Sequence, residues 1–334
     1  MSSNNSNSQR SLTFKEKLQN LVASFFPMSS SQLQSTVERA VESVQAGVHA
    51  RSSSIDDTHH GETSGQDISN PFDDSDAVHK LGPLAERSSK YNQWLLGVLQ
   101  RKNCRRILDA ACGTGVDSLF LLKHGMEVVS CDDAEAMLFY ARSEKERLGL
   151  KDWEVKRANW LTLDKDLEGH GQFDAVLCLG SSILHLVDRP PELKLHRQCL
   201  NNFQKFLKPG GLLLIDHRNI DSMMDRGIVV NKNVYHKEDT LPGVSTKTIT
   251  VDGVPTQVDI IYDMLMKDGD TGNNGFNKIE KVTMPLAPVH VHKFTALLKD
   301  VFGGNCTYTL YGDLEEVNNG NTENIAYFQH VVHE

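Results

Sequence analysis

The sequence predicts an α/β protein with a mostly parallel, doubly wound sheet, and three observations lead to that prediction. Apolar runs typical of strands alternate with helix-compatible segments between residues 77 and 218. One of these runs, residues 173–180, is almost continuously apolar, as strands buried on both faces are. A glycine-rich turn joins the first apolar run to the segment after it. Repeated strand and helix units of this kind build parallel sheets with helices on both faces.

Residues 1–76 are predicted to form a mostly disordered extension that carries short amphipathic helices. Ser and Asn dominate the first ten residues, and apolar side chains recur at helical spacing over residues 14–25 and 37–48. Residues 49–76 have the composition of a linker. The Ser-rich start is faintly similar to a mitochondrial transit peptide, but it holds few basic residues. Docking of these helices onto this chain or a neighbouring subunit is the preferred interpretation.

Residues 77–227 are predicted to form the core. A first helix over residues 86–101 places Tyr91, Trp94, Leu95 and Val98 on one face. Strands are expected at residues 107–111, 127–131, 153–157, 173–180 and from 212 onward, with helices at 117–124, 134–148 and 192–207. Glycine ends the second helix at residue 125, and a Pro-Gly-Gly sequence ends the fourth at residues 209–211.

After residue 218 the pattern changes to that of antiparallel strands. Within residues 228–285 the segments 247–251 and 257–266 alternate, and Asp-Gly turns follow at residues 252 and 268. We expect an antiparallel insertion over the active face. Residues 286–334, with a helix near 289–301 and a strand at 326–332, are expected to complete the core sheet.

Composition argues against several classes of function. The net charge is −9 with the two signs mixed along the chain, so the basic stripe of a nucleic-acid-binding protein is missing. No run approaches the roughly 20 apolar residues of a membrane span. Six cysteines without C-x-x-C spacing indicate free thiols in a reducing compartment, which favours the cytoplasm. Fourteen histidines include no H-E-x-x-H motif, so we expect no metal site.

The turn at residues 107–118 is the most informative stretch. A dinucleotide fingerprint would place glycines at Ala111, Gly113 and Val116, and only the middle position matches. The Gly-Lys-Ser/Thr of a P-loop is also missing. Asp109, Ala111, Gly113 and Gly115 instead resemble motif I of the class I S-adenosylmethionine (AdoMet) methyltransferases. An ordinary tight turn between strand and helix is the alternative.

The ends of the next strands supply further candidates for a cofactor site, because ligands of open α/β sheets lie at the carboxyl ends of the strands. Asp132 ends the second strand, where a carboxylate can accept hydrogen bonds from both ribose hydroxyls; a solvated turn acid is the alternative. Asn159 and Trp160 end the third strand. The amide suits the edge of adenine and the indole its face, although Trp160 could equally pack into the core.

Two further strand ends are candidates for the methyl-transfer site itself. Leu179 and Ser181 lie near any reacting methyl group, and His185 just beyond them could take a proton or be structural. Arg218 ends the fifth strand and could fork onto a substrate carboxylate. The alternative for Arg218 is a structural ion pair with Asp216 or Asp221.

Longer sequence strings resemble one family in particular. They are residues 94–97, 109–118, 158–166, 179–180, 209–213, 215–219 and 302–304. From about residue 80 to the end, the chain resembles the glycine N-methyltransferase family, most specifically in Ala-Asn-Trp-Leu-Thr-Leu-Asp-Lys-Asp and Ile-Asp-His-Arg-Asn.

The resemblance implies a Rossmann-like class I methyltransferase that moves a methyl group from AdoMet to glycine and forms sarcosine. It also implies a homotetramer, inhibition by reduced folates and an N-terminal segment that reaches a neighbouring subunit's site. The AdoMet contacts that it implies are Arg87, Ala111, Asp132, Asn159, Trp160, Leu179 and His185. Arg218 matches the arginine that holds the glycine carboxylate.

Departures from the family concentrate on the acceptor side. Ser181 stands where the family has an asparagine that helps to hold glycine, and Tyr262 and Tyr327 match family tyrosines. Tyrosine is replaced at Lys80, His236 and Thr283. Serine lacks the amide, so at least one substrate hydrogen bond should be weaker. Alternatives are therefore sarcosine or another small amine as acceptor, or a low-activity regulatory protein that binds AdoMet or folate.

Overall fold

The computed structural model describes residues 87–188, 192–232, 234–235, 243–267, 276–318 and 322–333. All of them belong to one compact unit, Ile68–Glu334. The helices expected within residues 1–76, the turn expected at residue 268, and Lys80 and His236 lie outside the described residues.

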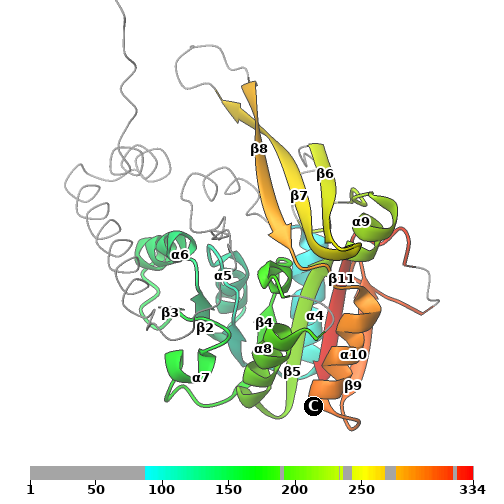
Figure 1. Cartoon of the computed structure of the whole chain (residues 1–334). Helices are drawn as coiled ribbons and strands as arrows, with labels where there is room; N and C mark the ends of the chain where they lie inside the picture. The colour runs from blue at the N-terminus through cyan, green and yellow to red at the C-terminus, as the bar shows by residue number, and fades with distance from the viewer. Residues whose placement is uncertain are drawn as a thin grey trace, which may run out of the picture. The chain divides into compact units, whose positions relative to one another are not determined.

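One eight-stranded sheet forms the centre of the fold, with the strand order β10-β9-β11-β5-β4-β1-β2-β3 (Figure 1). The parallel strands are β1 (Arg106–Asp109), β2 (Glu127–Asp132), β3 (Glu154–Arg157), β4 (Phe173–Cys178) and β5 (Leu207–Arg218). The antiparallel strands are β9 (Thr307–Gly312), β10 (Glu315–Glu316) and β11 (Tyr327–His333). The predicted α/β class with a mostly parallel sheet is confirmed.

Helices cover both faces of this sheet. They are α4 (Ser89–Arg101), α5 (Val116–Lys123), α6 (Glu135–Leu148), α7 (Leu163–Asp166), α8 (Lys194–Lys205), α9 (Ile220–Arg226) and α10 (Val291–Phe302), with the 3-10 helix η3 (Ser182–His185). Alternate strand residues enter two separate cores: Ile107 packs with side chains of α4 and α5, and Leu108 with those of α8 and α10. Two hydrophobic cores on opposite faces are what a doubly wound sheet requires.

A second sheet is antiparallel and has the order β6 (Gly243–Val251), β7 (Val254–Lys267) and β8 (Phe276–Leu286). The predicted turn between β6 and β7 is present, because Asp252 and Gly253 adopt φ angles of 52° and 76°. Val258, Ile260 and Met284 join the same core as α8 and α10. The buried side of this insertion therefore packs onto the main domain, near the carboxyl ends of β4 and β5.

Some elements differ from the sequence prediction. Strand β5 begins at Leu207, ahead of the predicted start, because Pro209-Gly210-Gly211 continues the strand. The short elements α9, β9 and β10 were not predicted. All three are short. Pairing with β11 stabilises β9, pairing with β9 stabilises β10, and the Asn219 cap stabilises α9.

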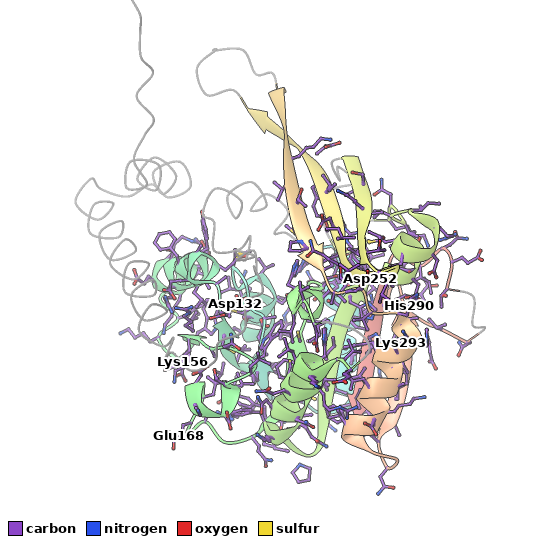
Figure 2. The ribbon with its side chains drawn as sticks, in the orientation of Figure 1. Asp132, Lys156, Glu168, Asp252, His290 and Lys293 are labelled. Carbon is purple, nitrogen blue, oxygen red and sulfur yellow. The ribbon has the colours of Figure 1, made fainter. Side chains whose placement is uncertain are left out.

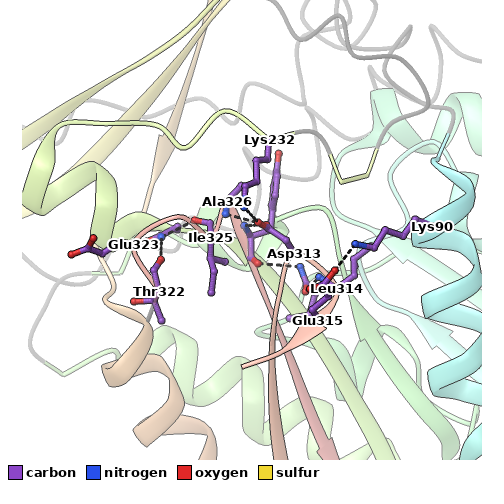
Figure 3. Close-up of polar contacts among 12 residues, drawn as sticks. Lys90, Lys232, Asp313, Leu314, Glu315, Thr322, Glu323, Ile325 and Ala326 are labelled. Atoms are coloured by element: carbon purple, nitrogen blue, oxygen red, sulfur yellow. Dashed lines mark hydrogen bonds and ion pairs between the residues drawn. The ribbon is translucent and has the colours of Figure 1, made fainter. Parts of the chain in front are cut away.

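The turn between β9 and β10 shows how tertiary contacts build such an element (Figure 3). Asp313 and Leu314 both adopt positive φ angles, 51° and 71°. The Asp313 carboxylate accepts hydrogen bonds from the backbone N–H groups of Ala326 and Tyr327, both at 3.0 Å. It also forms an ion pair with Lys232. These bonds fix the first residues of β11, so the position of the Tyr327 side chain depends on this turn.

No helix in the described part of the chain is long and apolar enough to cross a membrane.

We predict that Gly115→Ala destabilises the protein more than Gly125→Ala. Both glycines have left-handed backbone angles, with φ of 84° and 78°, so both substitutions carry about 1 kcal/mol of backbone strain. At Gly115 a Cβ would also lie 2.7 Å from the Trp153 ring, whereas nothing lies within 4 Å at Gly125. The collision should add about 1–3 kcal/mol. Denaturant unfolding measures both variants, and equal losses would contradict the prediction.

Candidate active site

The carboxyl ends of β1, β2, β4 and β5 bring the predicted polar residues to one edge of the central sheet, as expected for an open α/β fold. Asp132 lies there beside the start of α6 (Figure 2). Asp109, Asp132 and Asp216 each end or nearly end a strand; Asp109 and Asp216 are buried and Asp132 is partly buried. Burial raises the pKa of Asp109 to about 7 and the pKa values of Asp132 and Asp216 to about 6.

Asp109 holds the glycine-rich turn through a buried chain of hydrogen bonds. The Trp153 indole donates to Ser130 Oγ at 2.7 Å, the hydroxyls of Ser130 and Ser118 are 2.7 Å apart, and Ser118 Oγ donates to Asp109 at 2.5 Å. Ser118 has one hydroxyl proton and donates it to Asp109, so Ser130 is the donor to Ser118 and accepts from the indole. Asp109 therefore fixes the start of α5 and shapes the turn around Gly113.

Asp132 bridges the two loops that follow β1 and β2. Its oxygens accept hydrogen bonds from the backbone N–H of Gly113 at 2.9 Å and of Ala134 at 3.0 Å. Each carboxylate oxygen can accept a second hydrogen bond. Ala111 and Gly113 bear little or no side chain beside it, so a ribose could approach the carboxylate and the turn backbone together. These features fit the ribose of AdoMet.

Arg87 is held beside the turn by Asp117 in the first turn of α5. Two guanidinium nitrogens donate to the two Asp117 oxygens at 2.9 and 2.8 Å. Burial disfavours the charge on Arg87, but the Asp117 carboxylate outweighs it and raises the arginine pKa. The guanidinium carbon also lies 5.3 Å from the Tyr91 ring and 5.9 Å from the Tyr235 ring. The remaining N–H donors of Arg87 suit an anionic group such as the AdoMet carboxylate.

Asn159 and Trp160 already make contacts within the protein. The Asn159 amide donates to Asp133 at 3.0 Å and accepts from the Leu161 N–H at 2.9 Å. The Trp160 indole donates to the Ala110 carbonyl at 2.6 Å, and its ring meets Phe203 edge-on. The half-buried Trp160 is thus anchored to the core by its N–H and one edge. The face of the Trp160 ring could still stack on an adenine ring. Trp160 can therefore both pack against the core and bind the cofactor.

The turn after β4 contains two successive left-handed residues, Gly180 with φ of 77° and Ser181 with φ of 62°. Asp216 holds it by accepting the Ser181 backbone N–H at 2.6 Å. Leu179, just before the turn, is buried. The Ser181 hydroxyl is also buried and has no hydrogen-bond partner among the described residues. An unpaired buried hydroxyl costs about 1–3 kcal/mol, which a bound ligand could recover.

His185 is poorly suited to accept a proton. Its Nδ1 lies 3.2 Å from the Pro285 carbonyl, and a carbonyl can only accept, so this nitrogen carries the proton. Burial lowers the pKa of His185 to about 4. A neutral imidazole with so low a pKa is a weak base at neutral pH. The geometry therefore favours a positional role for His185 at the junction of η3 and β8.

Arg218 is a buried cation that lies between two tyrosine rings. Its side chain is 5% exposed, and its guanidinium carbon lies 4.5 Å from the Tyr327 ring and 5.7 Å from the Tyr262 ring. No carboxylate forms an ion pair with it within the described ranges of the chain. A buried charge without a counter-ion is unfavourable, so the setting fits an incoming anion.

Neither acid of the alternative ion pair engages Arg218. Asp216 accepts the Ser181 N–H, and Asp221 accepts the Val291 N–H at 2.9 Å. Burial opposes the charge on Arg218, but the neighbouring tyrosine hydroxyls raise its pKa, so the guanidinium remains charged. The alternative reading of Arg218 as a structural ion pair is wrong in this structure.

Several residues near the site were not assigned from the sequence. Tyr235 packs between Tyr91 and Tyr327, with ring centroids at 4.9 and 4.5 Å and interplanar angles of 54° and 73°, and its hydroxyl accepts from Gln329 at 2.9 Å. Asp117 holds Arg87. These residues come from separate parts of the chain, so their spacing in the sequence could not group them. Asp117, an acid two positions after Gly115, was the one signal in the sequence that could have indicated a partner for Arg87. Thr283 lies on the exposed side of β8, away from this cluster.

No group of three or more histidine, cysteine, aspartate or glutamate side chains is arranged to hold a metal ion within the described residues. All six cysteines have free thiols.

Comparisons with known proteins show the family of this chain. A model of the methyltransferase domain family matches residues 101–269. The glycine N-methyltransferase of Mus musculus is 37% identical over 257 residues, which are 75% of this chain and 87% of the mouse protein. The Homo sapiens protein of the same name is 37% identical over 259 residues, with the same coverage. This chain belongs to the glycine N-methyltransferase family. It is therefore an AdoMet-dependent methyltransferase.

More distant matches are consistent with membership of this family. The glycine/sarcosine N-methyltransferase of Parasynechococcus marenigrum is 34% identical over 175 residues, 51% of this chain and 59% of that protein. An AdoMet-dependent methyltransferase from Clostridium acetobutylicum has a similar structure, with a TM-score of 0.53, 17% identity and coverage of 73% of this chain and 90% of its own. At that identity the likeness shows the fold.

We predict that AdoMet affinity weakens as the pH falls through about 6. Burial raises the pKa of Asp132 to about 6, so below that pH its carboxyl group becomes protonated and loses its charge. A neutral acceptor makes a weaker hydrogen bond to a ribose hydroxyl. Asp132→Asn should bind AdoMet about tenfold more weakly at pH 8 and vary less with pH. Calorimetric titration measures both, and Asp164→Asn, an exposed acid elsewhere, is the control.

Proposed function

We propose that this protein transfers the methyl group of AdoMet to the amino group of glycine and forms sarcosine. The observation that carries the proposal is Arg218, a buried guanidinium between Tyr262 and Tyr327 that no carboxylate of the described residues neutralises. Its planar donors match the two oxygens of an amino-acid carboxylate. The names of the family relatives agree with such an acceptor.

The same proposal assigns the cofactor contacts. Asp132 would hold the ribose, Asn159 and Trp160 the adenine, and Arg87 the amino-acid end. Ala111, Gly113, Gly115, Leu179 and His185 would line the cofactor, and Asp109 would keep the turn in shape. The fit rests on the doubly anchored Asp132 carboxylate beside glycine backbone. AdoMet supplies an electrophilic methyl group when it is bound there.

The residues of this chain act mainly by positioning. Arg218 would pin the acceptor carboxylate, and the turn at Gly180 and Ser181 would face the acceptor amine. The amine must be neutral to attack. His185, with a pKa of about 4, is a weak base, and Asp109, with a pKa of about 7, already accepts a hydrogen bond from Ser118 in the turn. We therefore infer that the amine loses its proton on or before binding. A neutral amine is a strong nucleophile, so alignment and exclusion of water suffice.

We predict that Arg218→Lys lowers kcat/KM for glycine by about a hundredfold. An ammonium group cannot form the forked pair and must give up one of two charged hydrogen bonds, each worth about 1.5–3 kcal/mol. A methyl-transfer assay with purified protein measures the change, and AdoMet affinity should vary less than twofold in the same variant. Wild-type kcat/KM in Arg218→Lys would show that the arginine does not hold the acceptor.

A second candidate acceptor is sarcosine, and the observation that favours it is Ser181. Its side chain is smaller than the asparagine of the family, and its hydroxyl is buried without a partner. A secondary amine would gain room there. A panel of glycine, sarcosine and close amines separates the two candidates, and a clear preference for glycine would remove this one. Tight AdoMet binding without turnover across the panel would instead indicate a regulatory binding protein.

We predict that Ser181→Asn lowers the KM for glycine by about three- to tenfold, because it adds an amide that can hydrogen-bond the substrate. Asparagine tolerates the left-handed φ of 62° better than serine does, so stability should not fall. Ser181→Ala is the matched variant, and it should raise the KM by a few-fold if the hydroxyl contacts the substrate. Steady-state kinetics on the three proteins decides, and an unchanged KM in both variants would place Ser181 outside the acceptor site.

We further propose a cytoplasmic homotetramer that reduced folates inhibit, in line with the family resemblance and with six free cysteines. Light scattering of the purified protein and assays with added folate test these properties.

A further inference from the structure

Four side chains form a continuous chain of hydrogen bonds that starts at the backbone carbonyl of Arg218. His217 Nδ1 lies 2.7 Å from that carbonyl, and His217 Nε2 lies 2.8 Å from His330 Nε2. His330 Nδ1 lies 2.8 Å from the Tyr308 hydroxyl, which is 3.0 Å from Thr295 Oγ1. The chain thus runs from the active-site strand β5 through β11 and β9 to α10.

The Arg218 carbonyl fixes which atom donates in each hydrogen bond of this chain. A carbonyl only accepts, so His217 carries its proton on Nδ1 and presents a lone pair at Nε2. His330 must then donate from Nε2 and accept at Nδ1, and Tyr308 must be the donor to it. Thr295 in turn donates to Tyr308. A single orientation of all four groups satisfies every bond.

The surroundings keep both imidazoles neutral. His217 is 1% exposed and His330 0%, and the rings of Phe294 and Phe328 pack against them. Burial lowers the pKa of His217 to about 4 and that of His330 well below its usual value. An extra proton on His217 Nε2 would place two N–H donors against each other at 2.8 Å, and one on His330 Nδ1 would reverse the bond with the Tyr308 hydroxyl. The donor and acceptor order is therefore kept at neutral pH.

The anchored carbonyl belongs to the residue that is proposed to hold the substrate. Arg218 is the last residue of β5, and Asn219 already caps α9, so the peptide between them is a corner of the chain. Fixing the carbonyl fixes the plane of this peptide and the direction in which the Arg218 side chain leaves the backbone. Small displacements of a substrate-positioning group can reduce binding and rate strongly.

We propose that His330 is a positioning residue that, through His217, orients Arg218 to receive the acceptor carboxylate. The inference rests on the proposed function of Arg218. It assigns a role in acceptor binding to the buried core between β11 and α10, on the opposite side of β5 from the Tyr235 and Tyr327 rings.

The test uses acetate, a carboxylate without an amine, as a competitive inhibitor against glycine in the full-length protein. The His330 ring stacks on the His217 ring, with centroids 4.8 Å apart. His330→Phe keeps an aromatic ring at this position but removes both hydrogen bonds, and it should raise the acetate inhibition constant and the glycine KM about tenfold. AdoMet affinity and kcat should change less than threefold. His330→Gln restores one donor and one acceptor, and it should recover most of the loss.

Two further variants separate positioning from stability. Phe294→Leu loosens the packing around both histidines without removing a hydrogen bond, so it should leave the acetate constant unchanged. Tyr308→Phe breaks the chain at its half-buried outer end and should give a smaller increase, which keeps the proposal testable if His330→Phe does not fold. The positioning role would be overturned if the acetate inhibition constant rises no more in His330→Phe and Tyr308→Phe than it does in Phe294→Leu. If acetate does not compete with glycine in the wild type, the assignment of Arg218 itself fails.

Discussion

The antiparallel register between β5 and β11 is the constraint on which the rest of the site depends. Arg218 lies opposite Tyr327, His217 opposite Phe328 and Asp216 opposite Gln329. Opposed residues in a sheet share a face, so this register sends Arg218 and Tyr327 to one side and His217 to the other. A slip of β11 by one residue would move Tyr327 away from the face of Arg218 and His330 away from the face of His217.

The four residues that end β5 and follow it each hold a different part of the protein. Asp216 reaches across to the turn after β4, and His217 joins the buried chain that leads to α10. Arg218 enters the tyrosine cluster. Asn219 caps α9 and also donates to the carbonyls of Thr322 and Ile325 ahead of β11. One short segment thus contacts several neighbouring elements, which explains why all four side chains are buried although all are polar.

The charges of the site are arranged at the expense of stability. Three acids that are buried or partly buried have raised pKa values, and the cation of Arg218 has no carboxylate partner within the described residues. Such groups persist because backbone N–H groups, hydroxyls and aromatic rings partly replace water. The remaining hydrogen-bonding capacity is directed toward the ends of the strands, and a cofactor and a small acceptor would satisfy it.

The sequence by itself determined the α/β class, the cofactor turn and the strand-end residues from Asp109 to Arg218. These follow from local causes: apolar periodicity, glycines in a tight turn, and the rule that parallel strands end at one edge. Only the tertiary structure decided that Asp216 and Asp221 leave Arg218 unpaired, and that Tyr235, Tyr327 and His330 surround or support it. Those partners lie far apart along the chain, and the pairing with β11 holds β9 in the sheet. Which residues become partners depends on sheet register and burial, and neither is encoded in any one stretch of sequence.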